Sequence, residues 1–421
     1  MIQFNIIFYF FIILFVARSA VQLYLHLINR FHLRKNKNYI PEEFKDIIDS
    51  EKFQRISNYT MESESCEMTH TLINHFILLL LLLTGILPWW VELIGKTGFG
   101  PIVNGLIFFG SLGILSIFIR IPFSLYENFS IEARYGFNIM SLRLWLFDLI
   151  KSVLISFIIG GLILFILFLL IQKGGSLWWF FAWMITGAIE LLILWLFPIV
   201  IAPLFNKFEL IEDREISDQI KELMEKVGLR SGGVYKMDEA KRSKHTNAYF
   251  TGIGKTKRIV LYDTLLTSHP LEEIIAIVAH EIGHWKKKHI LKQIIFIEAI
   301  SFILFWGVSK FLNWNLPYLT FGFKGPIFYV GLFLYSIFIS LIGFFLQPLE
   351  SAMMRYFERE ADDISLELVG SSKPICESLK RLASDNLENL TPHPLFVWYY
   401  YSHPPFHERI SRLKNIKLRE V

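Results

Sequence analysis

The chain has 421 residues, of which 53% are hydrophobic and 16% aromatic, and its mean hydropathy is +0.44. This composition excludes an ordinary soluble domain, and long uncharged runs indicate a multispan membrane protein. The small net charge of +4 gives no support for nucleic-acid binding, and two distant cysteines, Cys66 and Cys376, argue against a disulfide framework or a cysteine zinc site.

Seven segments are long enough to cross a bilayer, which requires about 20 apolar residues. Arg18 interrupts the first segment, and the residues before it lack the basic stretch that opens a signal peptide, so we expect a retained membrane helix. The sequence therefore predicts a mainly α, multispan membrane fold. The predicted spans are residues 4–26, 72–95, 102–125, 148–172, 177–204, 290–313 and 326–348.

Basic residues alternate between the segments that join these spans. Residues 27–71, 126–147, 205–289 and the tail after 350 carry several Lys or Arg, whereas the loops near Lys96, Lys173 and Lys324 carry few. By the positive-inside rule, the four basic regions face the cytosol and the N-terminus faces outward.

The polar segment 206–289 has the pattern of a small α+β domain. Apolar residues at helical spacing run from Ile211 to Val227, and residues 234–237, 247–251 and 258–262 read as strands. A Gly-Ile-Gly-Lys turn joins the last two strands and lacks the earlier glycine of a phosphate-binding loop. We expect four parts: 1–205 with five spans, 206–289 as the cytosolic domain, 290–350 with two spans, and 351–421 as a cytosolic C-terminal part.

The most informative stretch is His280-Glu281-Ile282-Gly283-His284, in a helix expected to begin near Pro270. Histidines at i and i+4 share a helical face and can bind one zinc ion, while the glutamate between them can act as a general base. Glu281 would polarise a zinc-bound water, whose pKa the metal lowers to about 7, and carry its proton to the leaving amine. A purely structural histidine pair is the alternative.

A zinc hydrolase needs a third protein ligand and an open position for water. Glu358 is the best candidate, and Asp362, at i+4 on the same helical face, could hydrogen-bond a ligand histidine. Glu360 is the rival ligand and points elsewhere on the helix. A charged face exposed to solvent is the alternative without metal.

Charged residues inside the predicted spans are costly in lipid and usually face a protein interior or a water-filled space. Glu190 and Glu298 lie deeper in their spans than the others and suggest a polar cavity. Because a transporter would show the same feature, a transporter or membrane scaffold with an incidental zinc motif is a further alternative.

The run from His403 to Arg409 contains Pro404-Pro405 and could bring a histidine or an arginine to the site, to stabilise an oxyanion. From spacing alone, a structural Pro-Pro turn with solvated charges is the better interpretation.

Several further motifs occur in order along most of the chain, among them Pro122-Phe123-Ser124, Gly136-Phe137-Asn138, the run 202–208, Asn247-Ala248-Tyr249-Phe250 and the run 257–266. Together with 280–286, His403-Pro404-Pro405 and Glu408-Arg409, they resemble the type I CAAX prenyl protease family of integral-membrane zinc endopeptidases. The ordered set is highly specific, whereas any one motif alone is not.

The resemblance implies seven transmembrane helices around an intramembrane chamber, with the zinc metalloprotease domain at its cytosolic end. By match of position it implies zinc ligands His280, His284 and Glu358, one zinc ion per chain, the general base Glu281, the ligand support Asp362, the substrate-binding edge-strand residues Asn247 and Ala248, and His403 and Arg409 as groups that stabilise the transition state or orient the peptide.

Members of this family remove the last three residues of prenylated CAAX proteins. The expected partners are therefore membrane-anchored C-termini and the bilayer, not nucleic acid, and a monomer is compatible with the sequence. A second enzyme hypothesis keeps the catalysis but assigns non-prenylated or misfolded membrane proteins as substrates. The short loops fit prokaryotic relatives and favour a bacterial cytoplasmic membrane, or the endoplasmic reticulum membrane in a eukaryote, with the active site facing the cytosol.

Overall fold

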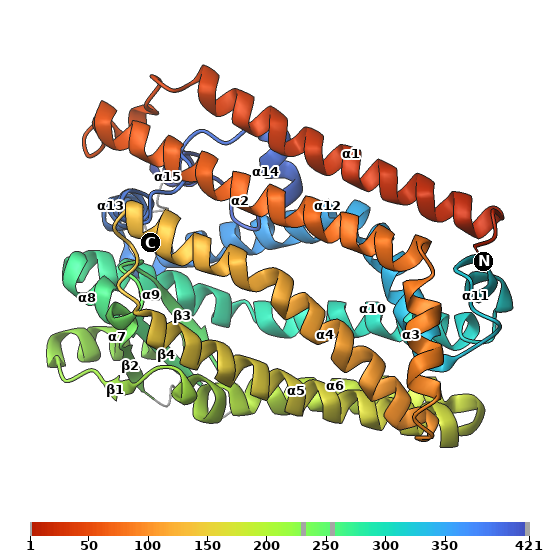
Figure 1. Ribbon diagram of the computed structural model, residues 1–421. Coiled ribbons are helices and arrows are strands. Elements are labelled where there is room, and N and C mark those ends of the chain that lie inside the picture. The colour runs from red at the N-terminus through yellow and green to blue at the C-terminus, as the bar shows by residue number, and fades with distance from the viewer. Residues whose placement is uncertain (1, 229–232, 253–256, 417–421) are drawn as a thin grey trace.

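Seven long apolar helices form the body of the molecule, in a computed structural model that describes residues 2–228, 233–252 and 257–416. These helices are long and apolar enough to span a membrane, so the predicted mainly α, multispan fold is confirmed. The seven helices are α1 (Ile6–Lys35), α2 (Ser50–Leu83), α4 (Pro101–Tyr126), α5 (Leu142–Lys173), α6 (Trp178–Leu196), α10 (His289–Phe311) and α12 (Phe328–Val369) (Figure 1). The π-helical turns Glu127–Glu132 and Phe197–Ile201 extend α4 and α6.

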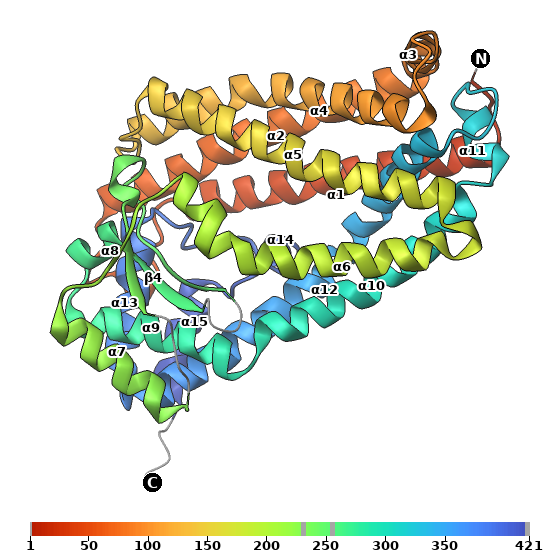
Figure 2. The same cartoon turned by 90° about the horizontal axis from the view of Figure 1, so that it is seen from below.

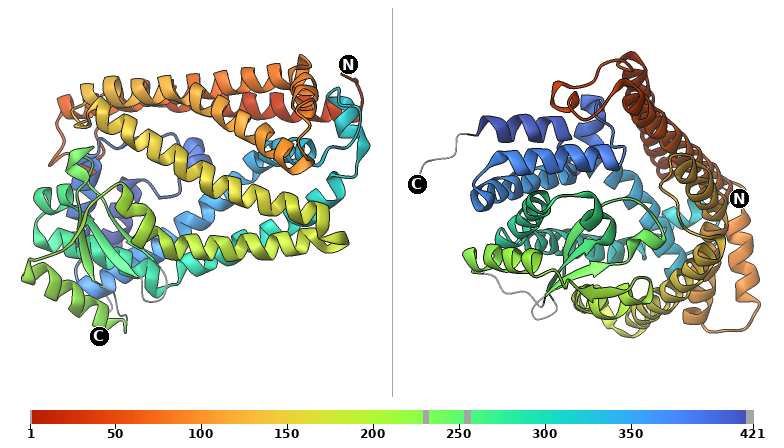
Figure 3. Two further views of the ribbon diagram at one scale, coloured as in Figure 1. Left: turned by 60° about the horizontal axis from the view of Figure 1, so that its bottom comes forward. Right: turned by 90° about the vertical axis from the view of Figure 1, so that its left-hand side faces the viewer.

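The shorter elements gather mainly at the two ends of this helix bundle (Figures 1 and 3). The end that holds the N-terminus carries α3 (Ile86–Gly95) and α11 (Asn315–Thr320). The opposite end carries a four-stranded sheet with the helices α7 (Arg214–Lys226), α8 (Asp263–Ser268), α9 (Leu271–Lys286), α13 (Ser372–Asp385) and α15 (Phe406–Asn415). A further helix, α14 (Pro394–Tyr400), packs against α1 and α12.

The prediction of residues 72–95 as a single span is wrong. α2 ends at Leu83 and α3 begins at Ile86. Between them Gly85 has a φ of +82°, a left-handed conformation that glycine adopts without a Cβ clash, so the chain turns there. α2 instead begins at Ser50 and α1 continues to Lys35, so much of the predicted loop 27–71 is helical.

Charged residues in the spans are paired against neighbouring helices. Arg18 of α1 donates from Nη1 to Ser340 Oγ at 3.0 Å, and its guanidinium lies 5.4 Å from the ring centroid of Phe344. On α10, the Glu298 carboxyl hydrogen-bonds to Glu190 and lies where α6 has a glycine instead of a side chain. The first span therefore tolerates its arginine because α12 supplies partners for the charge.

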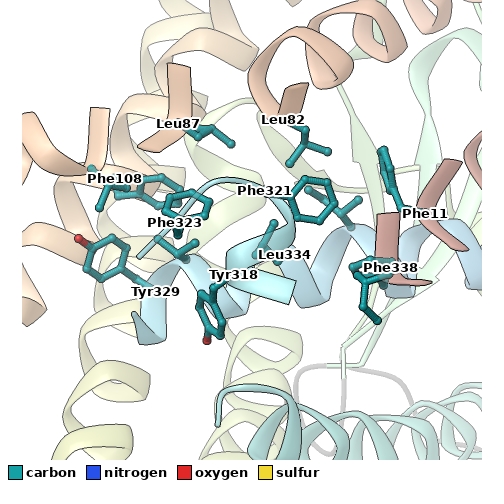
Figure 4. Close-up of a cluster of buried hydrophobic side chains, with 14 of the residues drawn as sticks. Phe11, Leu82, Leu87, Phe108, Tyr318, Phe321, Phe323, Tyr329, Leu334 and Phe338 are labelled. Carbon is teal, nitrogen blue, oxygen red and sulfur yellow. The ribbon is translucent and has the colours of Figure 1, made fainter. Parts of the chain in front are cut away.

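A hydrophobic core fills the bundle near its N-terminal end (Figure 4). Tyr318 of α11 is fully buried in it, and its hydroxyl donates to the carbonyl of Leu312 at 3.0 Å. This core fixes α12 against α1, α2, α3 and α4. The intramembrane chamber that the family resemblance implies stays a prediction. The labelled core residues are Phe11, Leu82, Leu87, Phe108, Tyr318, Phe321, Phe323, Tyr329, Leu334 and Phe338.

The sheet has the strand order β1-β2-β4-β3 and is mixed. β2 (Val234–Met237) pairs in parallel with β4 (Arg258–Tyr262), while β1 (Phe208–Leu210) and β3 (Ala248–Thr251) pair antiparallel at the two edges. The three predicted strands are present, whereas β1 was not predicted. The predicted turn between β3 and β4 lies partly outside the described residues.

The central helix α9 is buried between the sheet and α12 (Figure 2). On the sheet side its Ile274 and Val278 pack with Leu261 of β4. On the other side Ser365 Oγ of α12 donates to the carbonyl of Ala276 at 2.9 Å. A Cβ on Gly283 would lie 2.8 Å from the carbonyl oxygen of Ala361, so the two helices approach as closely as their backbones permit.

Helix α12 is continuous through the division predicted at residue 350. Its 42 residues span about 63 Å, twice the thickness of a hydrocarbon core, so its C-terminal half extends beyond the membrane. Pro348 inside it cannot donate to the carbonyl of Phe344, and the hydroxyl of Tyr399 in α14 donates to that carbonyl instead. The seventh span and residues 351–369 of the C-terminal part are therefore one continuous helix, although the predicted fourfold division of the chain stays a prediction.

We predict that Gly283→Ala destabilises the protein by about 1–3 kcal/mol, because the added methyl group forces α9 and α12 apart. The thermal midpoint in detergent would report this loss. The matched control is Gly343→Ala on α12, where nothing lies within 4 Å of the new Cβ, and it should leave the midpoint unchanged or slightly raised. An unchanged midpoint for Gly283→Ala would contradict the close packing.

Candidate metal centre

The sequence of α9 explains why it presents two histidines to one point. The helix begins after Pro270, has Glu272 and Glu273 in its first turn, and buries an apolar face against the sheet. Glu273 is also held by Arg381 of α13, whose Nε lies 2.8 Å from its carboxylate. His280 and His284 follow one another on the face that α12 approaches.

The three predicted ligands come together at this face. His280 Nε2 lies 3.1 Å from His284 Nε2, and these nitrogens lie 3.3 Å and 3.2 Å from the two carboxylate oxygens of Glu358. Ligand atoms about 2.1 Å from a tetrahedral metal ion lie about 3.4 Å apart, which matches these distances. The cluster therefore has the size of a zinc site, with three protein ligands and a fourth position for water.

Burial supports the same interpretation of the cluster. Glu358 is only 2% exposed, and its Oε2 accepts no hydrogen bond among the described residues, although His280 Nε2 lies 3.3 Å and Arg409 Nη1 3.7 Å away. A buried carboxylate oxygen without a donor is costly unless a cation satisfies it. The nitrogen and oxygen donors present are those that zinc prefers, so the residues fit this metal.

Asp362 lies behind the cluster rather than in it. Its Oδ1 is 3.0 Å from His280 Nδ1, the ring nitrogen that faces away from the other ligands. Arg409 of α15 donates to both oxygens of Asp362, from Nη2 at 2.6 Å and from Nε at 3.0 Å. The carboxylate can therefore fix the ring orientation of His280, and the arginine fixes the carboxylate.

The tail after α14 returns two predicted residues to the site. His403 Nε2 lies 3.2 Å from Glu358 Oε1, and its other ring nitrogen lies 2.9 Å from Ser402 Oγ. Its side chain is 61% exposed, so it can also reach a substrate. Arg409 is buried on Asp362 and lies 3.7 Å from Glu358, which favours an orienting role over direct contact with a peptide.

Glu281 and the edge strand line one cavity with the ligands. This cavity of about 400 Å³ is bounded by Asn247, Ala248, Glu281 and the three predicted ligands, among others. Burial raises the pKa of the Glu281 carboxyl, and the nearby His280 and His284 act against that rise. A carboxylate with a raised pKa accepts a proton from water more readily than an ordinary one.

The edge strand β3 presents Asn247 and Ala248 to the cavity. β3 pairs only with β4 among the described residues, so its other edge faces the cluster. The backbone N–H of Ala248 donates to the Asn247 side chain at 2.8 Å. A peptide that pairs with this edge through Ala248 would have to displace that local hydrogen bond.

The rival ligand Glu360 lies away from the cluster. Its carboxylate is 3.4 Å from Lys287 Nζ, 3.3 Å from Lys292 Nζ and 3.2 Å from His289 Nε2. The sequence analysis did not predict His289 as a site residue. In the structure its Nδ1 lies 3.0 Å from His284 Nδ1. The only signal in the sequence was its position five residues after His284, and this spacing belongs to no zinc motif.

Comparisons with known proteins agree with this geometry. The model "CAAX prenyl protease N-terminal, five membrane helices" matches residues 29–207, and the model "Peptidase family M48" matches residues 210–417. CAAX prenyl protease 1 of Saccharomyces cerevisiae is 32% identical over 417 residues, covering 93% of this chain and 92% of the relative. The Arabidopsis thaliana homolog is 31% identical, with 89% and 90% covered. The crystal structure of S. mikatae Ste24p superposes with a TM-score of 0.89 at 29% identity, covering 95% of this chain and 97% of that one.

We predict that Glu358→Ala abolishes stoichiometric zinc binding, because two histidines alone cannot hold the metal. The expected loss of affinity exceeds about 100-fold, the upper end for residues that only support ligands. Metal analysis of the purified protein measures it. Glu367→Ala, on the same helix but exposed, is the control that should retain zinc. Unchanged zinc in Glu358→Ala would move the third ligand elsewhere.

Proposed function

Because the chain belongs to the CAAX prenyl protease 1 family of M48 zinc metalloproteases, we propose that it removes the C-terminal tripeptide of prenylated CAAX-type proteins. It is a multi-pass integral membrane protein with seven predicted spans. The observation that carries the proposal is the cluster of His280, His284 and Glu358 beside an open strand edge, directly before the membrane helix α10.

One zinc ion per chain, held by His280, His284 and Glu358, would supply Lewis-acid chemistry and lower the pKa of a water in the site to about 7. Asp362 would keep His280 oriented from the rear, and Arg409 would keep Asp362 in place. These contacts support a rigid ligand set, which catalysis requires.

Glu281 would act as the general base. It takes a proton from the attacking water as the water oxygen bonds to the peptide carbonyl carbon. When the carbon–nitrogen bond breaks, the same carboxyl group gives that proton to the leaving amine, so a free amine and a carboxylic acid result. The acid then releases its own proton and becomes a carboxylate. His403, beside Glu358 and largely exposed, would donate a hydrogen bond to the oxyanion that forms on the carbonyl oxygen.

The substrate backbone would pair with β3 next to Asn247 and Ala248. Such strand addition gives affinity for any extended peptide, independent of its side chains. Because α10 begins three residues after α9 ends, a bound peptide lies near the membrane boundary. This proximity favours a C-terminus that is already anchored in the bilayer.

We also propose that the site faces the cytosol, since the segments around it carry the basic residues that remain on that side. A bacterial cytoplasmic membrane, or the endoplasmic reticulum membrane in a eukaryote, stays a prediction. Non-prenylated or misfolded membrane proteins are the second substrate class, and the peptide assay below distinguishes the two.

We predict that Glu281→Gln lowers kcat by about 10²–10⁴-fold while zinc content stays at one per chain, because the amide cannot accept the proton. Steady-state cleavage and metal analysis on the same preparation give both quantities. A variant that keeps the wild-type rate would remove Glu281 from the role of base.

We predict that a farnesylated CAAX peptide is cleaved with a kcat/KM at least about tenfold above that of its unmodified twin, a preference of roughly 1.4 kcal/mol. Product mass identifies the released tripeptide. A chelator and Glu281→Gln should each abolish the cleavage. Equal rates for the two peptides would reject the prenylated class and favour the second substrate class, while leaving the protease itself in place.

A further inference from the structure

His289 is the first residue of α10 and lies directly behind a predicted zinc ligand. Its side chain is 1% exposed. One ring nitrogen, Nδ1, is 3.0 Å from His284 Nδ1, and the other, Nε2, is 3.2 Å from Glu360 Oε2. The three side chains therefore form a line from the cluster to a carboxylate on α12.

Only one arrangement of protons makes this line compatible with a bound cation. His284 Nε2 faces His280 and Glu358, so it must offer its lone pair to the metal, and Nδ1 must carry the ring proton. In the described part of the chain, the acceptor 3.0 Å from that N–H is His289 Nδ1, which must then be unprotonated. His289 in turn carries its proton on Nε2 and donates it to Glu360.

The surroundings hold both outer members of the line in place. The His289 ring stacks on Phe357 with centroids 4.2 Å apart and planes 12° apart. Lys288, with a φ of +55°, makes the left-handed turn between α9 and α10 that directs the next residue inward. Lys287 and Lys292 lie against Glu360 and favour its charged, hydrogen-bond-accepting form.

We propose that His289 and Glu360 form a relay that fixes the tautomer and orientation of His284, so that both are positioning residues for the metal centre. The two histidine ligands would then be supported differently: His280 by the carboxylate of Asp362 directly, and His284 by Glu360 through a second imidazole. The inference rests on the proposed zinc site but not on the choice of substrate.

The test is the rate at which the purified zinc-loaded protein loses its metal to an excess of chelator. His289→Phe keeps a ring to stack on Phe357 but removes the acceptor for His284. We expect zinc dissociation about 10–100-fold faster than in the wild type, the range typical of residues that support a ligand. His26→Phe is the matched control, because His26 is also buried and packs on aromatic rings, yet lies in α1. It should lose zinc at the wild-type rate.

Three further variants separate the relay from simple packing. His289→Asn keeps an acceptor oxygen near the position of Nδ1 and should recover part of the retention. Glu360→Leu removes the acceptor for His289 Nε2 and should speed dissociation on its own, and the double variant His289→Phe with Glu360→Leu should be no faster than His289→Phe alone, because both changes break one line.

Several outcomes would overturn the relay. A folded His289→Phe protein that keeps zinc as long as the wild type would do so, as would fully additive effects in the double variant. If His289→Phe does not fold, Glu360→Leu alone decides, and a wild-type dissociation rate there rejects the proposal. A wild-type protein that holds no zinc would instead refute the proposed metal centre.

Discussion

The close contact between α9 and α12 is the constraint on which the rest of the molecule depends. The two helices belong to different parts of the chain. The predicted ligands on one helix can form a three-ligand zinc site only together with those on the other. Gly283 meets the backbone of Ala361, and this approach brings Glu358 within 3.3 Å of both histidine rings. The residues that serve the site on α12 recur at 358, 361, 362 and 365, which is one helical stripe. Gly283, the fourth residue of the His280–His284 motif, is thus a packing requirement.

Without a cation, the contact between α9 and α12 would carry a large electrostatic cost, because it buries carboxylates. Glu358 and Asp362 are buried about one helical turn apart, and four positive or protonatable groups surround them, namely His280, His284, His403 and Arg409. The cost of burying two carboxylates is offset by Arg409, the histidines and the expected metal. The long helix α12 can hold these buried carboxylates in place because its N-terminal half is packed in the hydrophobic core around Tyr318.

Much of the fold and most of the ligand set follow from sequence patterns, because helical spacing and hydropathy are local. The seven apolar helices, three of the strands and the pair of histidines are of this kind. The turn at Gly85 was missed, because an apolar run does not reveal where a glycine adopts a positive φ. The three-residue strand β1 was missed because so short a segment has no periodicity. The continuation of α12 past residue 350 was hidden by the change from apolar to charged residues, which marks a membrane surface and not a helix end.

The site itself shows the limit of local patterns more sharply. Glu358 and Glu360 are equally good ligands by composition, and helical phase favoured the face that meets His280 and His284 only because Asp362 shares it. His289 has no motif, and its role depends on the left-handed turn at Lys288 and on contact with a residue 71 positions later. Arg409 reaches His280 across 129 positions through Asp362. Such pairings arise from the packing of whole helices.

The position of Glu358 in the C-terminal half of α12 has a consequence for biosynthesis. His280 and His284 are made before α10, whereas Glu358 is made late in α12, and His403 and Arg409 are made after that helix. A nascent chain therefore has no complete ligand set until its seventh span has been synthesised. If these residues hold the zinc ion as proposed, the order of synthesis withholds peptide hydrolysis until insertion is nearly finished.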